Sequence, residues 1–371
     1  MNSNTLKKTY LNQIHRKYGA KLVDFHGWEL PVQFEGIIKE HLTVRQSVGL
    51  FDVSHMGQIF VEGKDARCFL DYINSNNVFK LKKGQGCYSH LPNEKGGIVD
   101  DVINLCLDDE RFLVIVNATT TQKDYEWFLK NSTRYNVKIT NKSAEYSMIA
   151  VQGPKSVEIM KRFVPELLKY PRFGVVEKEV MSKHCYISRT GYTGEDGFEI
   201  TAPNSIIADI WEEFMRLGND LGIKPCGLGS RDSLRLESGY LLYGSDIDDE
   251  HSSYEAGYGW VVKLNKGIFI GKEILEKQKK EGIKRKLTGI TMDEGIPRAG
   301  YKVFKDNQLL GTLTSATYSP SLKKSIGMGY MPLDLKIAEV VEVEIRGKRY
   351  KAKISEMPFY KGGVFFLSQK G

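Results

Sequence analysis

The sequence lacks the segments by which several classes of protein are recognised. No apolar run is long enough to cross a membrane, and no apolar core of a signal peptide lies near the N-terminus. No Gly-Lys-Ser/Thr loop occurs, and no GxGxxG turn opens a helix after a strand, so the common phosphate-binding loops are missing. No basic block is interleaved with aromatic residues. We therefore expect neither membrane insertion nor nucleic-acid binding.

Cysteine is scarce, and histidine lacks the spacing of metal ligands. The cysteines are odd in number and form no CxxC pair, which argues against a disulfide framework or a zinc knuckle and favours a reducing compartment. The acidic turn 244–250 lacks the ligand spacing of a calcium loop. We expect no metal and a bacterial cytoplasmic location. The basic, acid-poor stretch before residue 24 leaves a mitochondrial matrix location open. The five cysteines are Cys68, Cys87, Cys106, Cys185 and Cys226.

What is present is typical of a globular protein of two or three domains. The chain has 371 residues, of which 41% are hydrophobic and 27% charged. Its 36 glycines indicate many turns and short strands. The net charge of +7 is spread along the chain and fits an acidic protein partner or an anionic substrate.

Apolar periodicity divides the chain into a mixed part and an all-β part. Beyond about residue 285 helical patterning ends, and strands alternate with Gly, Asn and Pro turns, which predicts a separate barrel or Greek key. The charged stretch 276–285 is the best candidate for a linker. Helices are predicted over 5–18, 37–48, 64–73, 121–131, 155–163, 206–217 and 228–238. Strands are predicted over 25–32, 51–54, 57–61, 148–154, 287–292, 311–315 and 340–345, with several more between 84 and 117.

Two adjacent acids follow a well-specified turn and precede a strand. Pro92 to Gly97 carries strong turn residues, and Asp100 and Asp101 come directly before the apolar run 102–105. Neighbouring side chains on a strand point to opposite faces, so only one of these carboxylates can point inward. An inward carboxylate needs a partner and is a candidate for binding or acid/base work. The alternative is an acidic pair that ends a hairpin in solvent.

The segment 188–199 combines three glycines with three acids. Glycines at this density let the backbone approach a ligand closely. Glu195, Asp196 and Glu199 would repel a phosphate, but they suit a ligand rich in N–H donors such as a pterin or purine edge. The alternative is a turn-rich hairpin on the surface.

Two further clusters have simpler interpretations. Arg231 and Arg235 share a helix face at four-residue spacing, which is also typical of a surface helix with ion pairs. Asp52, Ser54 and His55 are neighbours on one strand and cannot converge as a hydrolase triad, which draws its members from distant segments.

The ordered set of motifs resembles the T proteins of the glycine cleavage system, within the folate-binding superfamily. No single motif decides this, but the set runs nearly the whole length of the chain in order. The motifs are DFHGWELP (24–31), FDVSHMG (51–57), NEKGGIVDD (93–101), VNA (116–118), QGPK (152–155), RTGYTGEDGFE (189–199), GLGSRD (227–232), LYGSDID (242–248), FIGKE (269–273), TS (314–315) and SP (319–320).

The resemblance implies an α+β architecture of three domains around a central opening, with a C-terminal all-β barrel. It implies a discontinuous folate-binding domain over 1–50 plus 140–240, a second domain over 51–139 plus 241–280, and the barrel over 285–371. It also implies an aminomethyltransferase that moves a methylene group from the aminomethyl-lipoyl arm of H protein to tetrahydrofolate, releasing ammonia and 5,10-methylenetetrahydrofolate. The lipoylated H protein is the implied partner. The rivals are a folate-dependent demethylase of a small methylated amine on the same fold, and a non-enzymatic folate-binding assembly or repair factor.

The same resemblance assigns roles by position. Asp101 matches the family's catalytic carboxylate, which lies near the reactive nitrogens of the folate. Glu199 matches a pterin-binding acid, and Arg231 matches a conformational and ligand-binding arginine. The remaining matches are pocket positions, the last of them loosely aligned: Met56, Tyr88, Asn117, Tyr192 and Tyr360.

The sequence departs from the family pattern at three places. Cys87 stands where a small or apolar residue is expected, and His90 is also unusual. Ser252-Ser253-Tyr254 replaces the Thr-Pro-Leu that tends to follow the acidic turn. Gly86-Cys87-Tyr88 is similar to the cysteine motif of an iron–sulfur repair branch, but Ser89-His90 follows instead of Gly and Gln, so we discount that branch.

Overall fold

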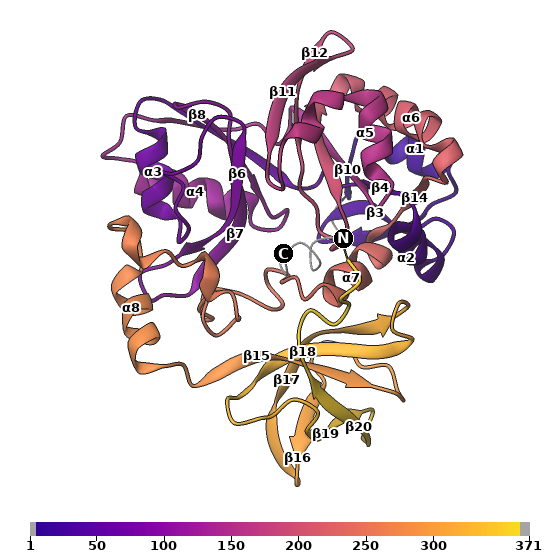
Figure 1. The fold of residues 1–371 in the computed structure, drawn as a ribbon, viewed down its shortest axis with the longest axis vertical. Helices are drawn as coiled ribbons and strands as arrows, with labels where there is room; N and C mark the ends of the chain where they lie inside the picture. The colour runs from indigo at the N-terminus through magenta and orange to yellow at the C-terminus, as the bar shows by residue number, and fades with distance from the viewer. Residues whose placement is uncertain (1–4, 364–371) are drawn as a thin grey trace.

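Three groups of strands and their helices surround the centre of the molecule. A computed structural model describes residues 5–363. It places one lobe of purple segments on the left of Figure 1, one lobe on the right that mixes indigo and magenta segments, and a yellow-orange barrel below them. Segments far apart in the sequence share the right-hand lobe, because the chain leaves it after the first strands and returns later. No helix within the described range is long and apolar enough to cross a membrane.

The right-hand lobe is built on a six-stranded sheet in the order β11-β12-β13-β10-β4-β14. Its central strands are buried, their apolar side chains form a core, and α6 packs Trp211 and Phe214 into the same core. The strands are β4 (Gly49–Asp52), β10 (Tyr146–Gln152), β11 (Val175–Val180), β12 (Lys183–Ser188), β13 (Gly197–Pro203) and β14 (Lys224–Cys226). Its helices are α5 (Ser156–Phe163) and α6 (Ile207–Leu217), with the short turns η1 (Pro165–Lys169), η2 (Asn204–Ile206) and η3 (Asn219–Leu221).

The N-terminal segment corrects one prediction. The helix expected over 5–18 begins only at Asn12, because Lys7 and Lys8 pair in parallel with Trp28 and Glu29 at the edge of a small sheet. The pairing takes the backbone of this stretch out of the helical conformation. The elements are β1 (Lys7–Lys8), α1 (Asn12–Lys17), β2 (Lys21–Phe25), β3 (Trp28–Gln33) and α2 (Ile37–Gln46).

The left-hand lobe is a five-stranded sheet in the order β6-β7-β8-β5-β9, covered by two helices. The helix predicted over 121–131 has the same bounds in the structure, and its Phe128 packs edge-on against Phe69. The strands are β5 (Gly57–Glu62), β6 (Gln85–Pro92), β7 (Ile98–Cys106), β8 (Arg111–Val116) and β9 (Lys138–Asn141), and the helices are α3 (Ala66–Ile73) and α4 (Thr121–Asn131).

The C-terminal part is a closed six-stranded barrel, which confirms the all-β prediction for this region. Closure removes the free strand edges, and the interior is filled by apolar side chains such as Ile290, Val303 and Val343. The strands are β15 (Arg285–Met292), β16 (Lys302–Lys305), β17 (Gln308–Ser319), β18 (Lys324–Pro332), β19 (Val340–Ile345) and β20 (Lys348–Ser355).

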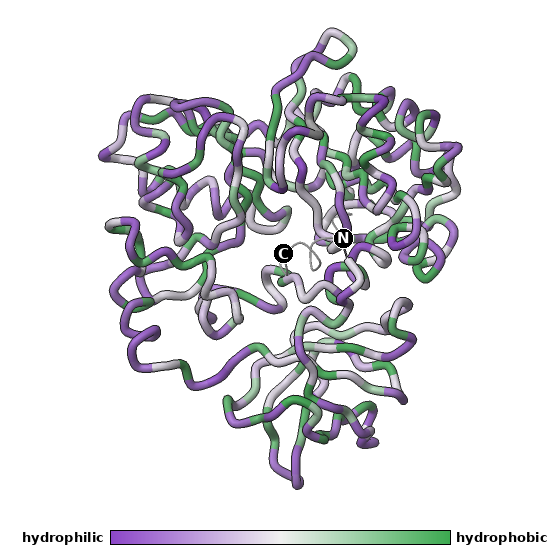
Figure 2. Tube along the Cα trace, in the orientation of Figure 1, coloured by the Kyte–Doolittle hydropathy of each residue, from purple (hydrophilic) through white to green (hydrophobic). Residues whose placement is uncertain are grey.

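The connection to the barrel corrects a second prediction. The linker expected over 276–285 is mostly helical, since α8 spans Lys272–Glu281. The tube along α8 is largely hydrophilic in Figure 2, as its Lys- and Glu-rich sequence implies. Only Leu275 on this helix is buried. The many charged residues of α8 are explained by its position, because most of the helix faces solvent and only a narrow face contacts the rest of the protein.

One buried carboxylate joins the barrel to the right-hand lobe. Glu237, at the end of α7 (Leu228–Glu237), is fully buried and pairs with Arg45 at 2.8 Å. It also accepts a hydrogen bond from the Ser321 hydroxyl at 2.9 Å and lies 3.1 Å from His41 Nε2. These partners lower the pKa of Glu237 to about 2 against the effect of burial. The side chain therefore stays ionised and fixes α2, α7 and the barrel relative to one another.

Candidate active site

A central cavity of about 1570 Å³ lies between the three lobes. Residues of both upper sheets, of α7 and of the barrel line it. All eight side chains that the sequence singled out as site residues line this one cavity: Met56, Tyr88, Asp101, Asn117, Tyr192, Glu199, Arg231 and Tyr360. The fold thus brings together positions that lie up to about three hundred residues apart.

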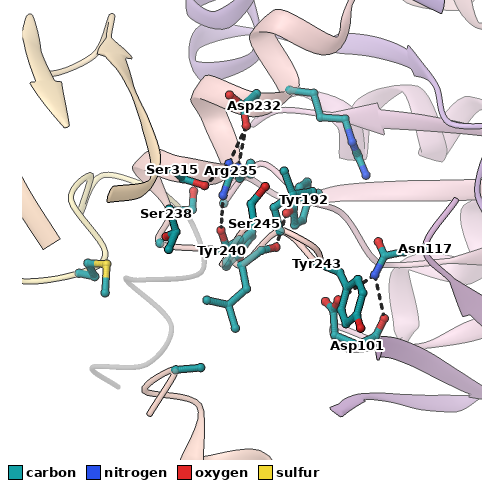
Figure 3. A pocket seen from close by; sticks show the side chains of 18 of the residues that line it. Asp101, Asn117, Tyr192, Asp232, Arg235, Ser238, Tyr240, Tyr243, Ser245 and Ser315 are labelled. Carbon is teal, nitrogen blue, oxygen red and sulfur yellow. Dashed lines mark hydrogen bonds and ion pairs between the residues drawn. The ribbon is translucent and has the colours of Figure 1, made fainter. Parts of the chain in front are cut away.

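Asp101 is held at the cavity wall by two hydrogen bonds. The Asn117 side-chain amide donates to its Oδ1 at 2.7 Å (Figure 3). The Tyr88 hydroxyl donates to its Oδ2 at 3.0 Å. Burial is the largest influence on this group, and together with the nearby Asp100 carboxylate it raises the pKa of Asp101 to about 7. The carboxyl group can therefore change its protonation state at physiological pH.

Asp100 points away from the cavity into the body of the left-hand lobe. It has no exposed surface and accepts hydrogen bonds from the Asn117 amide at 2.8 Å and from the Thr120 hydroxyl at 2.7 Å. Asp124, on α4, is equally buried, and burial followed by the Asp100 carboxylate raises its pKa far above the usual range. The two acids are therefore not a pair in bulk solvent, because strand alternation turns Asp100 into the lobe and Asp101, which is partly buried, toward the cavity.

Glu199 and Arg231 face the cavity from the right-hand lobe and α7. Glu199, on β13, accepts a hydrogen bond from the Thr190 hydroxyl, and burial raises its pKa. The Arg231 guanidinium lies 4.6 Å from the centre of the Tyr192 ring, and it makes no hydrogen bond with any residue between 5 and 363. A carboxylate acceptor and an uncommitted five-donor cation at one wall suit a flat heterocycle with N–H and C=O groups on its edge.

These placements decide two alternatives left open by the sequence. The segment 188–199 is not a surface hairpin, because Thr190, Thr193 and Glu199 are all buried. The helix with Arg231 and Arg235 is not a surface helix with ion pairs, because it forms part of the cavity wall. Arg235 itself is 2% exposed.

Arg235 is a residue whose position the sequence did not explain. Its guanidinium donates to Asp232 and to the Ser315 hydroxyl, both at 2.8 Å (Figure 3). It also donates to the buried Asp246 at 2.7 Å. It thereby ties α7 to strand β17 of the barrel. Its role is to hold the wall that carries Arg231, one helical turn before it.

Met56 and Tyr360 complete the list of predicted positions. Met56 lines the cavity after the turn that follows β4. Tyr360 lies under the Arg45 guanidinium, which is 4.3 Å from the ring centre, and its backbone N–H donates to the Glu237 carbonyl at 2.9 Å. The segment after β20 is thus fastened to the same buried cluster that joins the barrel to the right-hand lobe.

An aromatic wall next to Asp101 was not predicted. The Tyr88 and Trp260 rings stack with centres 6.0 Å apart, and His90 stacks on Tyr258 at 5.9 Å. Trp260 remains 54% exposed although it lines the cavity. The only signals in the sequence are the departures at His90 and Ser252-Ser253-Tyr254, which precede the Tyr258-Gly259-Trp260 turn.

The described part of the chain offers no cluster of His, Cys, Asp and Glu that could hold a metal ion. All five cysteines, which lie between residues 68 and 226, are free thiols. Burial raises the pKa of Cys87 to about 12, so this thiol beside Tyr88 is a poor nucleophile and a poor ligand.

Family models match almost the entire described chain. Residues 11–266 match the model described as the GCVT N-terminal domain. Residues 285–361 match the glycine cleavage T-protein C-terminal barrel domain. The chain belongs to the glycine cleavage T-protein family. The match confirms the resemblance stated from the motifs and the α+β architecture with a C-terminal barrel.

Individual T-protein family members are similar over their full lengths. The chain is 47% identical over 362 residues to an aminomethyltransferase of Thermoanaerobacter pseudethanolicus, covering 96% of this chain and 98% of that protein. It is 46% identical over 366 residues to an aminomethyltransferase of Lysinibacillus sphaericus, covering 97% and 99%. The crystal structure of the glycine cleavage system aminomethyltransferase T from Bartonella henselae superimposes with a TM-score of 0.89 at 32% identity, covering 96% and 99%.

Proposed function

We propose that this chain carries out its activity, aminomethyl transfer in the glycine cleavage system, with tetrahydrofolate in the central cavity and Asp101 beside the reacting nitrogens. The observation that carries the proposal is one partly buried carboxylate, bonded by Asn117 and Tyr88, that faces a cavity of about 1570 Å³. A cavity of this size admits a folate and the end of a lipoyl arm together.

The reaction exchanges two bonds at one carbon. The methylene group arrives bonded to the sulfur of the lipoyl arm of H protein and to an amine nitrogen. Two folate nitrogens replace these atoms, the amine leaves as ammonia, and the sulfur leaves as a thiol. The two N–H protons of the folate balance the two groups that leave. The products are 5,10-methylenetetrahydrofolate, ammonia and dihydrolipoyl H protein.

Asp101 acts on the charge that develops during this exchange. As ammonia departs, the methylene carbon takes on iminium-like positive charge, and a carboxylate fixed beside it stabilises that charge without reorganisation. The bonds from Asn117 and Tyr88 fix the orientation of the carboxylate, so it also orients the attacking nitrogen. Because the ionised form is the active one and the pKa is about 7, kcat rises with pH through neutrality.

The other wall residues bind the folate. Glu199 accepts N–H bonds from the pterin ring, and Arg231 donates to its carbonyl edge or to the folate tail. Tyr192 supports the Arg231 guanidinium from below. Met56 and Tyr360 supply apolar and aromatic surface at the edge of the site.

The partner and the location follow from the same proposal. A lipoylated H protein delivers the arm, and the net charge of +7 supports association with an acidic partner. We place the reaction in the bacterial cytoplasm. The division into domains 1–50 plus 140–240, 51–139 plus 241–280, and 285–371 also stays a proposal, and limited proteolysis at the predicted boundaries tests it.

A reconstituted assay tests the catalytic role. Purified H protein carrying the aminomethyl arm is mixed with the enzyme, and methylenetetrahydrofolate is followed with and without tetrahydrofolate. Asp101→Asn is expected to lower kcat by roughly 10²–10³-fold while folate binding changes by less than about tenfold. The matched control is Asp109→Asn, which removes an acid whose side chain is 93% exposed at the turn after β7.

Two outcomes count against the proposal. Equal losses in folate binding and turnover in Asp101→Asn would make this residue a binding group. Transfer to tetrahydrofolate from a small methylated amine without H protein would assign the chain to demethylase chemistry instead.

A further inference from the structure

A chain of four hydrogen-bonded side chains ends on the catalytic carboxylate. The Ser253 hydroxyl lies 2.8 Å from His90 Nδ1. His90 Nε2 lies 3.1 Å from the Tyr88 hydroxyl, which lies 3.0 Å from Asp101 Oδ2. Each distance is that of an ordinary hydrogen bond. Asp101 is therefore connected, through the Tyr88 hydroxyl, to a histidine that is not among the residues lining the cavity.

The fold forces these groups together from two distant segments. Tyr88 and His90 are two residues apart on β6 and share a face, and His90 is the direct cross-strand partner of Asp101 on β7. Ser253 comes from the loop before η4 (Gly259–Val261), and neither Ser253 nor His90 is more than 1% exposed. His90 and Ser253 are also two of the positions at which the sequence departs from the family motifs, and here they contact each other. The hydrogen bond between His90 and Ser253 offers a single physical explanation for the departure from the family motifs at both positions.

The protons along the chain have only two consistent arrangements. Tyr88 and Ser253 each have one hydroxyl proton, and a neutral imidazole has one N–H. When Asp101 is ionised, Tyr88 donates to it and can only accept from His90. The imidazole proton is then on Nε2, and Ser253 donates to the bare Nδ1.

Protonation of Asp101 on Oδ2 reverses every bond. The acid then donates to the Tyr88 oxygen, Tyr88 donates to a bare Nε2, and the imidazole proton lies on Nδ1 and points at the Ser253 oxygen. Only hydrogen atoms move, because each distance between heavy atoms suits either direction. Oδ1 keeps its bond from Asn117 in both states.

We propose that His90 is a positioning residue that keeps Asp101 hydrogen-bonded in both of its protonation states by changing tautomer while remaining neutral. The catalytic meaning of this device rests on the proposed role of Asp101. An aliphatic side chain at position 90 would support only the ionised state, since Tyr88 would have no acceptor once Asp101 held a proton. The histidine thus allows the carboxyl group to gain and lose a proton during turnover without losing its orientation.

The surroundings of His90 keep it neutral. Burial lowers the pKa of the imidazole to about 3, and no carboxylate of the described residues hydrogen-bonds to it. Asp101 faces it across β7, and the Tyr258 ring covers its face. The titratable and charged groups around this chain, which act on Asp101, Tyr88 or Tyr258, are Asp100, Tyr192, Tyr240 and Arg172.

Nitrogen-15 NMR of the substrate-free enzyme tests the tautomer change directly. With histidine labelled, the His90 proton is expected on Nε2 above about pH 8 and on Nδ1 below about pH 6, with no imidazolium signal between. His90→Gln identifies the resonance. A single tautomer over the whole range, or a doubly protonated ring, would overturn the proposal. This measurement needs no substrate, so its result does not depend on whether the proposed transfer reaction is correct.

A variant series tests the effect on Asp101. His90→Leu removes the bond to Tyr88 in both states, but only the protonated state leaves the Tyr88 hydroxyl proton without an acceptor, and a buried donor without a partner costs more than an oxygen with a free lone pair. The proton affinity of Asp101 is therefore expected to fall about tenfold. The pKa seen in the pH dependence of kcat and in the carbon-13 titration of the carboxyl group falls by about one unit. His90→Gln, whose amide can donate or accept, is expected to restore this pKa to within a few tenths of a unit. His184→Leu, an exposed histidine on β12, is the matched control. A purely structural role would lower kcat at all pH values without moving this pKa, and that result would also overturn the proposal.

Discussion

The buried acid Asp124 gives the structure a stability that depends on pH. Asp124 lies on α4 behind Asp100, has no exposed surface, and has a pKa raised far above its unfolded value, first by burial and then by the Asp100 carboxylate. The folded protein therefore holds one more proton than the unfolded chain at neutral pH. Since the folded state binds the extra proton, stability is greatest below the unfolded pKa and falls as pH rises. Asp124→Asn replaces the protonated acid by a neutral group of the same shape.

The magnitude follows from the protons involved. Holding the acid protonated at pH 7, against an unfolded pKa near 3.9, costs about 4 kcal/mol, because each unit is worth about 1.4 kcal/mol. Between pH 5 and pH 8 this single group lowers the free energy of unfolding by about 4 kcal/mol, as an upper figure. The amide of Asp124→Asn does not titrate, so the variant is expected to lack this dependence of stability on pH.

Urea denaturation at several pH values measures this. The difference in unfolding free energy between Asp124→Asn and wild type is expected to grow in favour of the variant from pH 5 to pH 8. Asp109→Asn controls for the loss of one formal charge on the same lobe, since its side chain is almost fully exposed. Parallel pH curves for wild type and Asp124→Asn would refute the argument and mean that Asp124 is ionised in the folded protein.

Three other predictions follow from the site and its frame. Glu199→Gln is expected to raise KM for tetrahydrofolate by about tenfold or more with a smaller change in kcat, and steady-state kinetics that show a loss in kcat alone would contradict a binding role. Gly97→Ala is expected to lower the unfolding free energy by about 3 kcal/mol, because the added Cβ would lie 1.8 Å from the Asp249 carbonyl oxygen. An unchanged midpoint in urea denaturation would show that the acidic turn 244–250 can move aside. Raising sodium chloride from about 50 to about 300 mM is expected to slow H-protein association about tenfold in stopped-flow experiments, and an equal rate would exclude charge steering.

Local periodicity predicted the regular elements well where one face of the element is buried. The helix over 121–131 and the strand over 340–345 have in the structure the bounds that their apolar spacing predicts. The helix predicted over 5–18 was too long because its first residues pair in parallel with strand β3 at Trp28. The local sequence contains no pattern from which this pairing could be predicted. The linker at 276–285 was wrong because high charge describes a solvated helix as well as it describes a loop.

The sequence predicts that the site residues lie together only through the ordered set of family motifs. Asp101 and Glu199 lie on different sheets, and nothing in their local sequence places them at one cavity. The contact between His90 and Ser253, which lie 163 positions apart, is invisible to spacing arguments for the same reason. The sequence shows that both residues depart from the family motifs, but only the structure shows the hydrogen bond between them.

The cavity belongs to no single sheet. Its walls come from the small N-terminal sheet, both large sheets, α7 and the barrel, so that no fragment of the chain contains a working portion of it. A rigid-body shift of one lobe would change the volume of the cavity without changing the conformation of any side chain that lines it. The contacts between the lobes, such as the cluster around Glu237, therefore set the dimensions of the cavity as much as the side chains that line it do.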